Sequence, residues 1–221
     1  MKQQEEKKGG VLVDLNNNFS YQVILGTALG DGHIRKRSEG SKASIRIGHS
    51  IDKSEYLMWI LKHLREIAEV TNVGIVKGGK YEKSPNDYVY ISSRASDSIT
   101  EIWELLYKDK KKKISKKLLD NFDDVSFAVF LMDDGSFDKH IDSMCYYLHT
   151  NAHTLEENEM FANFLKDKYG LNPIIRNVKK GEGYCIWFPK KDSMKICEIV
   201  KPVISEIECM RYKLADEYVQ K

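Results

Sequence analysis

Two acidic residues, Asp31 and Asp134, occupy matching positions in two similar apolar segments that each end in glycine. The first segment, residues 23–32, reads VILGTALGDG, and the second, residues 127–135, reads FAVFLMDDG. The two acids lie about a hundred residues apart, close to half of the 221-residue chain. An internal repeat that brings one carboxylate from each half together would create a site for divalent cations, which prefer anionic oxygen ligands.

Both segments have the pattern of buried helices, and the acids stand where a helix disfavours them. Gly26 and Gly30 are four residues apart, so they share one helix face and leave room for another backbone. Gly32 and Gly135 predict left-handed helix ends, which puts both acids in a last turn. A carboxylate there costs roughly 0.3–1 kcal/mol against the helix dipole. Ordinary Asp-Gly helix ends would explain either segment alone, whereas the repetition favours a bound cation.

These segments resemble the LAGLIDADG homing endonuclease family, and most closely its monomeric, two-motif branch found in group I introns. Residues 25–32 stand for the first motif and residues 130–136, FLMDDGS, for the second. The likeness runs from about residue 19 to 214, because its C-terminal signature matches residues 186–190, 200–202 and 211–214. The departures are at helix-packing positions: Val129 replaces a motif glycine, and Leu29 and Met132 replace the motif's first acid.

The resemblance implies an α+β fold of two pseudo-symmetric α-β-β-α-β-β-α halves. The motif helices would pack at the interface, and antiparallel sheets would form a saddle for DNA. Residue patterns agree: alternating segments predict hairpins at 33–50, 73–92 and 136–151 and strands near 173–179 and 184–188, and helical spacing follows residues 52, 96 and 154. The expected divisions are an N-terminal tail 1–17, a first repeat 18–107, a lysine-rich linker 108–123 and a second repeat 124–221.

Helices on one side of each sheet would leave a polar face free for DNA, since an antiparallel ribbon fits the major groove. In the first half this face would carry His33, Arg35, Arg37, Arg46, Tyr88 and Tyr90. In the second half the candidates are Lys139, His140, Tyr147, His149, Arg176, Lys179 and Lys180. A solvated face with ordinary charge is the alternative, and the resemblance favours DNA.

The lysine run at residues 108–117 reads as a solvated linker that also contacts phosphates. By resemblance, one lysine per half lies near the metals: Lys112 or Lys113 in the first half and Lys213 in the second. Such residues would position the attacking water or stabilise charge on the phosphate.

The implied reaction is metal-dependent hydrolysis of double-stranded DNA by a monomer. Asp31 and Asp134 would hold Mg²⁺, for which Mn²⁺ or Ca²⁺ can substitute in binding, with the carbonyls of Gly30 and Asp133 as further ligands. Two sites at one pseudo-dyad would cut both strands and leave short 3′ overhangs in a long, asymmetric target, which would promote intron mobility. A free-standing intron-encoded enzyme is favoured over an intein.

Composition limits the other classes. A net charge of +2 gives no overall basic signal, so DNA contacts must be local. The four cysteines contain no CxxC pair and suggest reduced thiols in an intracellular protein of a bacterial, phage or organellar compartment. No apolar run predicts a membrane span. Two alternatives stay open: a maturase that binds intron RNA, and a DNA-binding protein on a retired nuclease scaffold.

Overall fold

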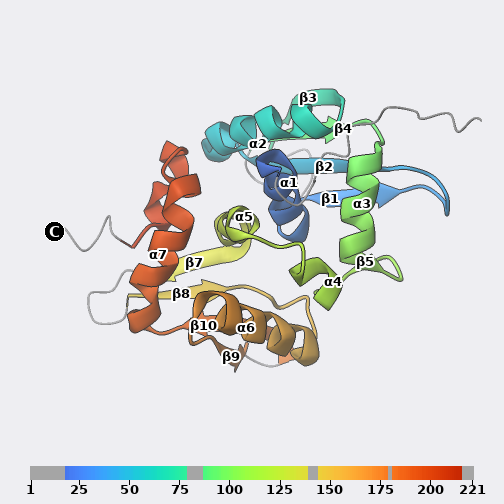
Figure 1. Ribbon diagram of the computed structural model, residues 1–221. Helices are drawn as coiled ribbons and strands as arrows, with labels where there is room; N and C mark the ends of the chain where they lie inside the picture. Colours follow the sequence, from blue (N-terminus) through green and yellow to red (C-terminus); the bar gives the residue numbers. More distant parts are fainter. Residues whose placement is uncertain (1–17, 79–86, 139–143, 179–180, 216–221) are drawn as a thin grey trace, which may run out of the picture.

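The computed structural model describes residues 18–78, 87–138, 144–178 and 181–215, and it contains two halves with the same order of elements (Figure 1). The first half comprises α1 (Phe19–Leu29), β1 (His33–Lys36), β2 (Ala43–Ser50), the 3₁₀ helix η2 (Ile51–Lys53), α2 (Ser54–Ile67), β3 (Val70–Val76), β4 (Tyr88–Ser93) and α3 (Asp97–Leu106). The second half comprises α5 (Asp124–Asp134), β7 (Gly135–Asp138), β8 (Cys145–Leu148), α6 (Leu155–Tyr169), β9 (Ile174–Asn177), β10 (Tyr184–Phe188), α7 (Lys190–Ile204) and the 3₁₀ helix η4 (Glu208–Lys213).

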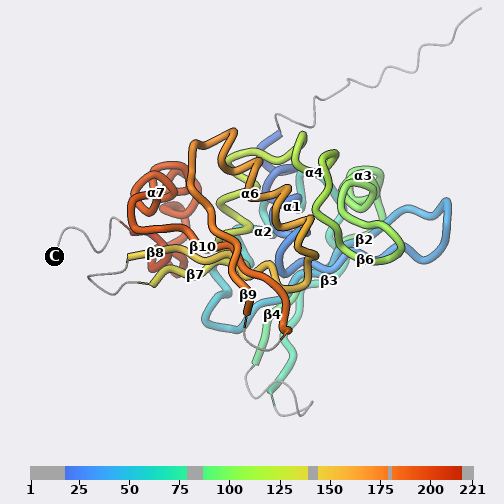
Figure 2. Tube along the Cα trace, turned by 90° about the horizontal axis from the view of Figure 1, so that it is seen from below, coloured from blue at the N-terminus to red at the C-terminus, as the bar shows by residue number. Residues whose placement is uncertain are grey.

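Each half builds a four-stranded antiparallel sheet, and the two sheets have equivalent strand orders. The order is β1-β2-β4-β3 in the first half and β7-β8-β10-β9 in the second. Helices α3 and α7 lie at opposite ends of the molecule, and α1 lies between them in both views (Figure 2). The predicted α+β architecture of two α-β-β-α-β-β-α halves is confirmed. The predicted tail, residues 1–17, lies outside the described residues, and the exact division into repeats stays a prediction.

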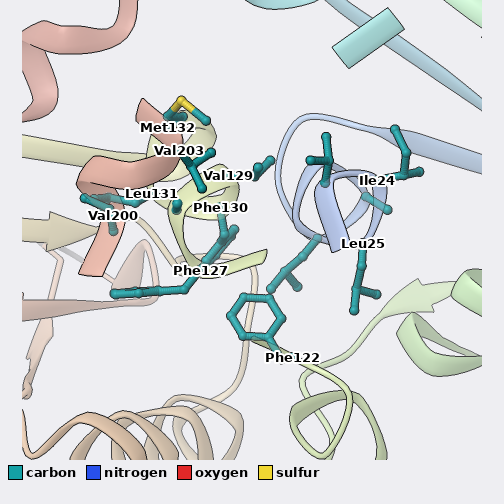
Figure 3. Close-up of a cluster of buried hydrophobic side chains, with 14 of the residues drawn as sticks. Ile24, Leu25, Phe122, Phe127, Val129, Phe130, Leu131, Met132, Val200 and Val203 are labelled. Atoms are coloured by element: carbon teal, nitrogen blue, oxygen red, sulfur yellow. The ribbon is translucent and has the colours of Figure 1, made fainter. Parts of the chain in front are cut away.

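Helices α1 and α5 form the centre of the core, as their apolar sequences predicted. Residues 20–29 of α1 and 126–132 of α5 are buried on all sides of their helices. A helix at the surface would instead have one apolar and one polar face. Figure 3 shows α5 between α1 and α7, with Ile24 and Leu25 on one side and Val200 and Val203 on the other. Both helices begin at side-chain caps: Asn18 accepts a hydrogen bond from the Tyr21 amide, and Asp123 accepts from two amides of α5.

The glycines after the motif helices do not adopt the left-handed conformation that the sequence predicted. Neither Gly32 nor Gly135 has a positive φ. They are required by space instead: a Cβ atom at Gly32 would lie 2.8 Å from the carbonyl oxygen of Thr27, and one at Gly135 would lie 2.4 Å from that of Leu131. The chain therefore turns from helix into strand so tightly that a side chain at either position would collide with the preceding turn.

The lysine-rich connection between the halves contains regular secondary structure. It forms a hairpin of β5 (Tyr107–Lys108) and β6 (Lys111–Lys112), followed by the short helix α4 (Lys116–Leu119). Asp109 and Lys110 both have positive φ, 52° and 61°, which is typical of the two-residue turn that matches strand twist. No helix in the described ranges combines the length and the apolar character that a membrane crossing requires.

The contact between α1 and α5 gives a first prediction. A Cβ atom at Gly26 would lie 2.6 Å from the carbonyl oxygen of Ser126 and 2.8 Å from Cβ of Val129. Gly26→Ala should therefore lower the free energy of unfolding by about 1–3 kcal/mol through overpacking, although alanine favours helices by itself. Urea denaturation measures this. Lys62→Ala, on the exposed side of α2, is the control and should change stability by less than about 0.5 kcal/mol. Unchanged stability of Gly26→Ala would contradict the close contact.

Candidate metal centre and nucleic-acid interface

The C-terminal ends of α1 and α5 place the two predicted acids beside each other. Asp134 is the last residue of α5, and Asp31 lies two residues beyond the end of α1, in a turn. Asp31 is exposed and Asp134 is partly buried. Because the two helices pack together, the carboxylates interact: the charge of Asp31 helps to raise the pKa of Asp134.

A third carboxylate, Asp133, connects the two helix ends. Its Oδ1 accepts a hydrogen bond of 2.7 Å from the hydroxyl of Tyr56 on α2. Its Oδ2 accepts one of 3.2 Å from the backbone N–H of Asp31. The side chain thus reaches from α5 into the first half, whereas the sequence had suggested only its backbone carbonyl as a ligand.

A histidine completes a cluster around Asp31. The Nδ1 of His49, near the end of β2, lies 3.6 Å from Oδ2 of Asp31, and the ring packs against Tyr56 with centroids 4.9 Å apart. Asp31, His49 and Asp133 each offer a ligand atom, and these atoms lie within 4.8 Å of one another. In the described part of the chain they form the one such group of at least three His, Cys, Asp or Glu side chains. Alternation with Ile45 and Ile47 would have placed His49 on the inner side of its strand, but nothing in the sequence linked it to the acids.

Two of the predicted lysines lie at the helix ends and one does not. Lys112 donates hydrogen bonds to the carbonyl oxygens of Gly30 (2.6 Å) and Leu29 (3.3 Å), at the end of α1. Lys213 donates in the same way at the end of α5, to the carbonyl oxygens of Leu131 (3.1 Å), Gly135 (2.7 Å) and Met132. Each ammonium group thus offsets the negative end of one motif helix.

Lys113, the other candidate in the first half, points elsewhere. Its Nζ lies 3.6 Å from Glu157 of α6. The geometry therefore pairs Lys112 with Lys213 as equivalent residues of the two halves, and a catalytic role for either lysine stays a prediction. The carbonyl of Gly30, a candidate metal ligand, accepts the hydrogen bond of Lys112.

The charges at the helix ends are strained against one another. Burial, together with the nearby Asp31, raises the pKa of Asp134 to about 6. Burial raises the pKa of Asp133 well above its usual range, and Asp31 adds to the shift. Burial also lowers the pKa of Lys112, and lowers that of Lys213 to about 8. Carboxylates that are hard to ionise together, with carbonyls beside them, are the setting in which a divalent cation is stabilising.

The outer face of the first sheet carries most of the predicted basic and aromatic residues. His33 and Arg35 are exposed on β1, and Arg37 is exposed just after it. Arg46 stacks on the ring of Tyr90 at 4.1 Å, and its Nη2 donates to the hydroxyl of Tyr88 at 3.2 Å. Strand pairing brings Arg46 opposite His33, so these side chains form one polar surface that leads to Asp31.

The second sheet presents a similar but less basic face. Tyr147 pairs with Trp187 across β8 and β10, and the guanidinium of Arg176 lies 3.8 Å from the ring of Trp187. The backbone of His149 is next to Asp134, since its backbone N–H donates to the backbone carbonyl of Asp134 at 2.8 Å, and its ring Nε2 lies 2.9 Å from Oγ of Ser136. Trp187 was not among the predicted residues of this face. The alternation of Trp187 with the buried Ile186 along the strand could have indicated that it points outward. The other candidates, Lys139, His140, Lys179 and Lys180, lie outside the described residues.

The chain, with its two helix ends, two sheets and paired lysines, is similar to known proteins. The model of the LAGLIDADG DNA endonuclease family matches residues 21–196, most of the chain. The chain belongs to this family. The structure of the homing endonuclease I-WcaI bound to its DNA recognition sequence is similar, with a TM-score of 0.76, 23% identity and coverage of 90% of this chain and 86% of that one. I-DmoI in complex with DNA and Ca is more distant, with a TM-score of 0.50, 14% identity and coverage of 85% and 91%. These two likenesses concern the LAGLIDADG fold.

Curated relatives are longer proteins. The chain is 26% identical over 219 residues to the cytochrome b mRNA maturase bI2 of Saccharomyces cerevisiae, which covers 92% of this chain and 50% of that protein. It is 23% identical over 209 residues to a protein named RecA from Mycolicibacterium chitae, which covers 90% and 47%. The chain thus spans about half the length of these curated relatives.

The raised pKa of Asp134 gives a second prediction. An acid whose pKa is higher in the folded state stabilises the fold below its unfolded pKa, and this contribution is lost as pH rises through about 6. In EDTA, Asp134→Asn should therefore raise the thermal midpoint by about 2–4 °C near pH 8 and change it little near pH 4. Mg²⁺ should raise the midpoint of the unchanged protein near pH 8 and that of the variant less. A variant less stable than the unchanged protein near pH 8 would contradict the electrostatic strain.

Proposed function

We propose that this LAGLIDADG protein is a site-specific, divalent-metal-dependent endonuclease that cuts both strands of a DNA duplex. The observation that carries the proposal is the meeting of Asp31 and Asp134 at two packed helix ends, with one lysine at each end. The two acids and the neighbouring carbonyls form a hard oxygen donor set that suits Mg²⁺. When bound, the metal would activate water and stabilise the leaving oxygen.

The chain's own residues would bind and orient the DNA. The face with Arg35, Arg46 and Tyr90 in the first half and that with Tyr147 and Arg176 in the second flank the acids. Arginines on an antiparallel ribbon can contact phosphates or guanine edges in the major groove. Since the faces differ in charge and side chains, one monomer should recognise an asymmetric target, and cuts from one pseudo-dyad would leave short 3′ overhangs. Promotion of intron mobility would follow from such cutting.

The lysines would act on charge at the two scissile phosphates. Lys112 and Lys213 already offset the negative helix ends, and burial lowers the pKa of both, that of Lys213 to about 8. A lysine of this kind can orient the attacking water or stabilise the developing negative charge on the phosphate. One lysine for each strand fits the two equivalent positions in the structure.

The similarity to the maturase bI2 favours a second candidate, the binding of intron RNA. The same basic faces could bind a structured RNA through its phosphates. The two candidate functions differ in what they require of the acids. Cleavage needs Asp31 and Asp134 ionised and bound to metal, whereas RNA binding does not. Relative affinity for duplex DNA and for the surrounding intron transcript, measured at one salt concentration, separates the two functions.

The acids can be tested one at a time. Asp31→Asn and Asp134→Asn should each keep DNA binding and reduce double-strand cleavage at least about 100-fold, because a metal supplies several kcal/mol of transition-state stabilisation. The target is obtained first, by sequencing the ends produced from a randomised duplex library with Mg²⁺ and with EDTA. Either variant cutting both strands at the full rate would refute the assignment, and folded protein that cuts nothing would favour RNA binding.

The two neighbouring lysines provide a matched pair of variants. Lys112→Met should slow cleavage by about 100-fold, since Lys112 contacts the end of α1 beside the acids. Lys113→Met removes the same charge one residue later, but Lys113 pairs with Glu157, so the expected loss is less than about fivefold. Single-turnover cleavage of the selected target measures both. Equal losses in the two variants would mean that overall charge matters, and not position.

A further inference from the structure

The cluster around Asp31 contains a donor type that Mg²⁺ does not prefer. Asp31 comes from the end of α1, His49 from β2 and Asp133 from α5, so both halves contribute. Their ligand atoms lie within 4.8 Å of one another. Two ligand atoms that each lie about 2.0–2.2 Å from one ion are at most about 4.4 Å apart, so shifts of about half an ångström would bring all three onto a common ion.

The imidazole of His49 is an incompletely paired buried group. Its side chain is 9% exposed, and its Nε2 is buried without a hydrogen-bond partner among the described residues. Its Nδ1 faces Oδ2 of Asp31 at 3.6 Å, longer than a hydrogen bond. A neutral ring carries one N–H and one lone pair. With the N–H on Nδ1, the buried Nε2 lone pair has no partner; with the N–H on Nε2, the Nδ1 lone pair faces the carboxylate, which is unfavourable unless a cation lies between them.

Tyr56 holds both of the other groups in place. It is 1% exposed, and its hydroxyl donates to Oδ1 of Asp133 at 2.7 Å, which leaves Oδ2 facing Asp31. Its ring packs on His49 at 4.9 Å. Residues that orient ligands through their remaining hydrogen bonds are typical of metal sites.

In the part of the chain that the structure describes, the surroundings of Asp134 lack counterparts of His49, Tyr56 and Asp133. The strand pairs His33 with Arg46 and Ser136 with Tyr147 set the correspondence, which places Thr150 at the position of His49. The starts of α2 and α6 likewise place Glu157 at the position of Tyr56, and the match of Asp31 with Asp134 in the sequence places Gly30 at that of Asp133. Thr150 donates to Asn158, and Glu157 accepts from the N–H of Thr154, so both side chains are hydrogen-bonded within the second half. Within the described ranges, the mixed nitrogen and oxygen donor set is therefore found around Asp31 and not around Asp134.

We propose that Asp31, His49 and Asp133 form a binding site for a divalent transition-metal ion. Imidazole nitrogen favours ions such as Co²⁺ or Zn²⁺, whereas an all-oxygen set suits Mg²⁺ and Ca²⁺. The charges of the two carboxylates balance those of the ion, which is favourable in a partly buried position. The inference extends the metal dependence proposed above and rests on it, with a different ion preference at Asp31 and at Asp134.

The test reads ligation directly and does not use cleavage. Mn²⁺ is added to the metal-free full-length protein without DNA, and pulsed electron paramagnetic resonance detects coupling to ¹⁴N of a bound imidazole. We expect this coupling in the unchanged protein, and its absence would overturn the proposal without any variant. The coupling should disappear in His49→Gln and persist in His63→Gln, which replaces another buried histidine of the first half.

Affinity for Co²⁺, followed by visible absorption, tests the rest of the cluster. His49→Gln and Asp133→Asn should each weaken binding at least 10-fold, and Tyr56→Phe, which keeps the ring and removes the hydroxyl, about 10-fold or more. His63→Gln should bind as the unchanged protein does, and a large excess of Mg²⁺ should not displace Co²⁺. Unchanged affinity in His49→Gln would overturn the proposal. Cleavage without nitrogen ligation would refute this inference alone, and nitrogen ligation without cleavage would refute only the proposed nuclease.

Discussion

The close contact between α1 and α5 is the constraint on which the rest of the molecule depends. Gly26 and Gly30 face α5, and a Cβ atom at either would lie 2.6 Å from atoms of Ser126 or Asp133. Because the helices approach this closely along their length, their C-terminal ends meet, and the acids that follow them meet as well. The sheets extend outward from these ends, so the same contact also fixes how the two polar faces lie relative to the acids.

Bringing two helix ends together concentrates negative charge, and nearby positive groups offset only part of this charge. The carbonyls of both last turns have no partner within their own helices, and three carboxylates lie beside them. Lys112 and Lys213 bind those carbonyls from two separate segments, one between the halves and one near the C-terminus of the described chain. The remaining strain on Asp133 and Asp134 is the kind that active sites retain at the expense of stability, since a ligand relieves it.

The sequence predicted the parts of this arrangement that depend on local patterns. Apolar residues on every side of both motifs indicated buried helices, and alternation of Ile45 and Ile47 with Arg46 assigned the faces of β2 correctly. The capping box of Thr154 and Glu157 began α6 where expected. Such signals are reliable because they involve residues a few positions apart.

What could not be predicted depends on distant contacts. Asp109 and Lys110 lack the glycine that usually marks a tight hairpin, so the turn that directs Lys112 to the end of α1, and Lys113 to α6, was not visible. The side chain of Asp133 acquires its role only because Tyr56 and the Asp31 amide, from the other half, lie beside it. The glycines after the motifs were predicted correctly as helix ends but for the wrong reason, since space and not a positive φ requires them.

The two halves share a fold, but they contribute different kinds of side chain to the interface between them. The first half supplies the small residues: Gly26 packs against Val129, and Gly30 packs against Asp133. The absence of a side chain at Gly30 leaves room for the carboxylate of Asp133 from the other helix, and this carboxylate accepts a hydrogen bond from the backbone N–H of Asp31. Val129 replaces a motif glycine in α5, and Gly26 of α1 leaves the space that it needs. Because large side chains of α5 face glycines of α1, the surroundings of the two acids are chemically different. Pseudo-symmetry of the backbone therefore does not imply equivalence of the two sites.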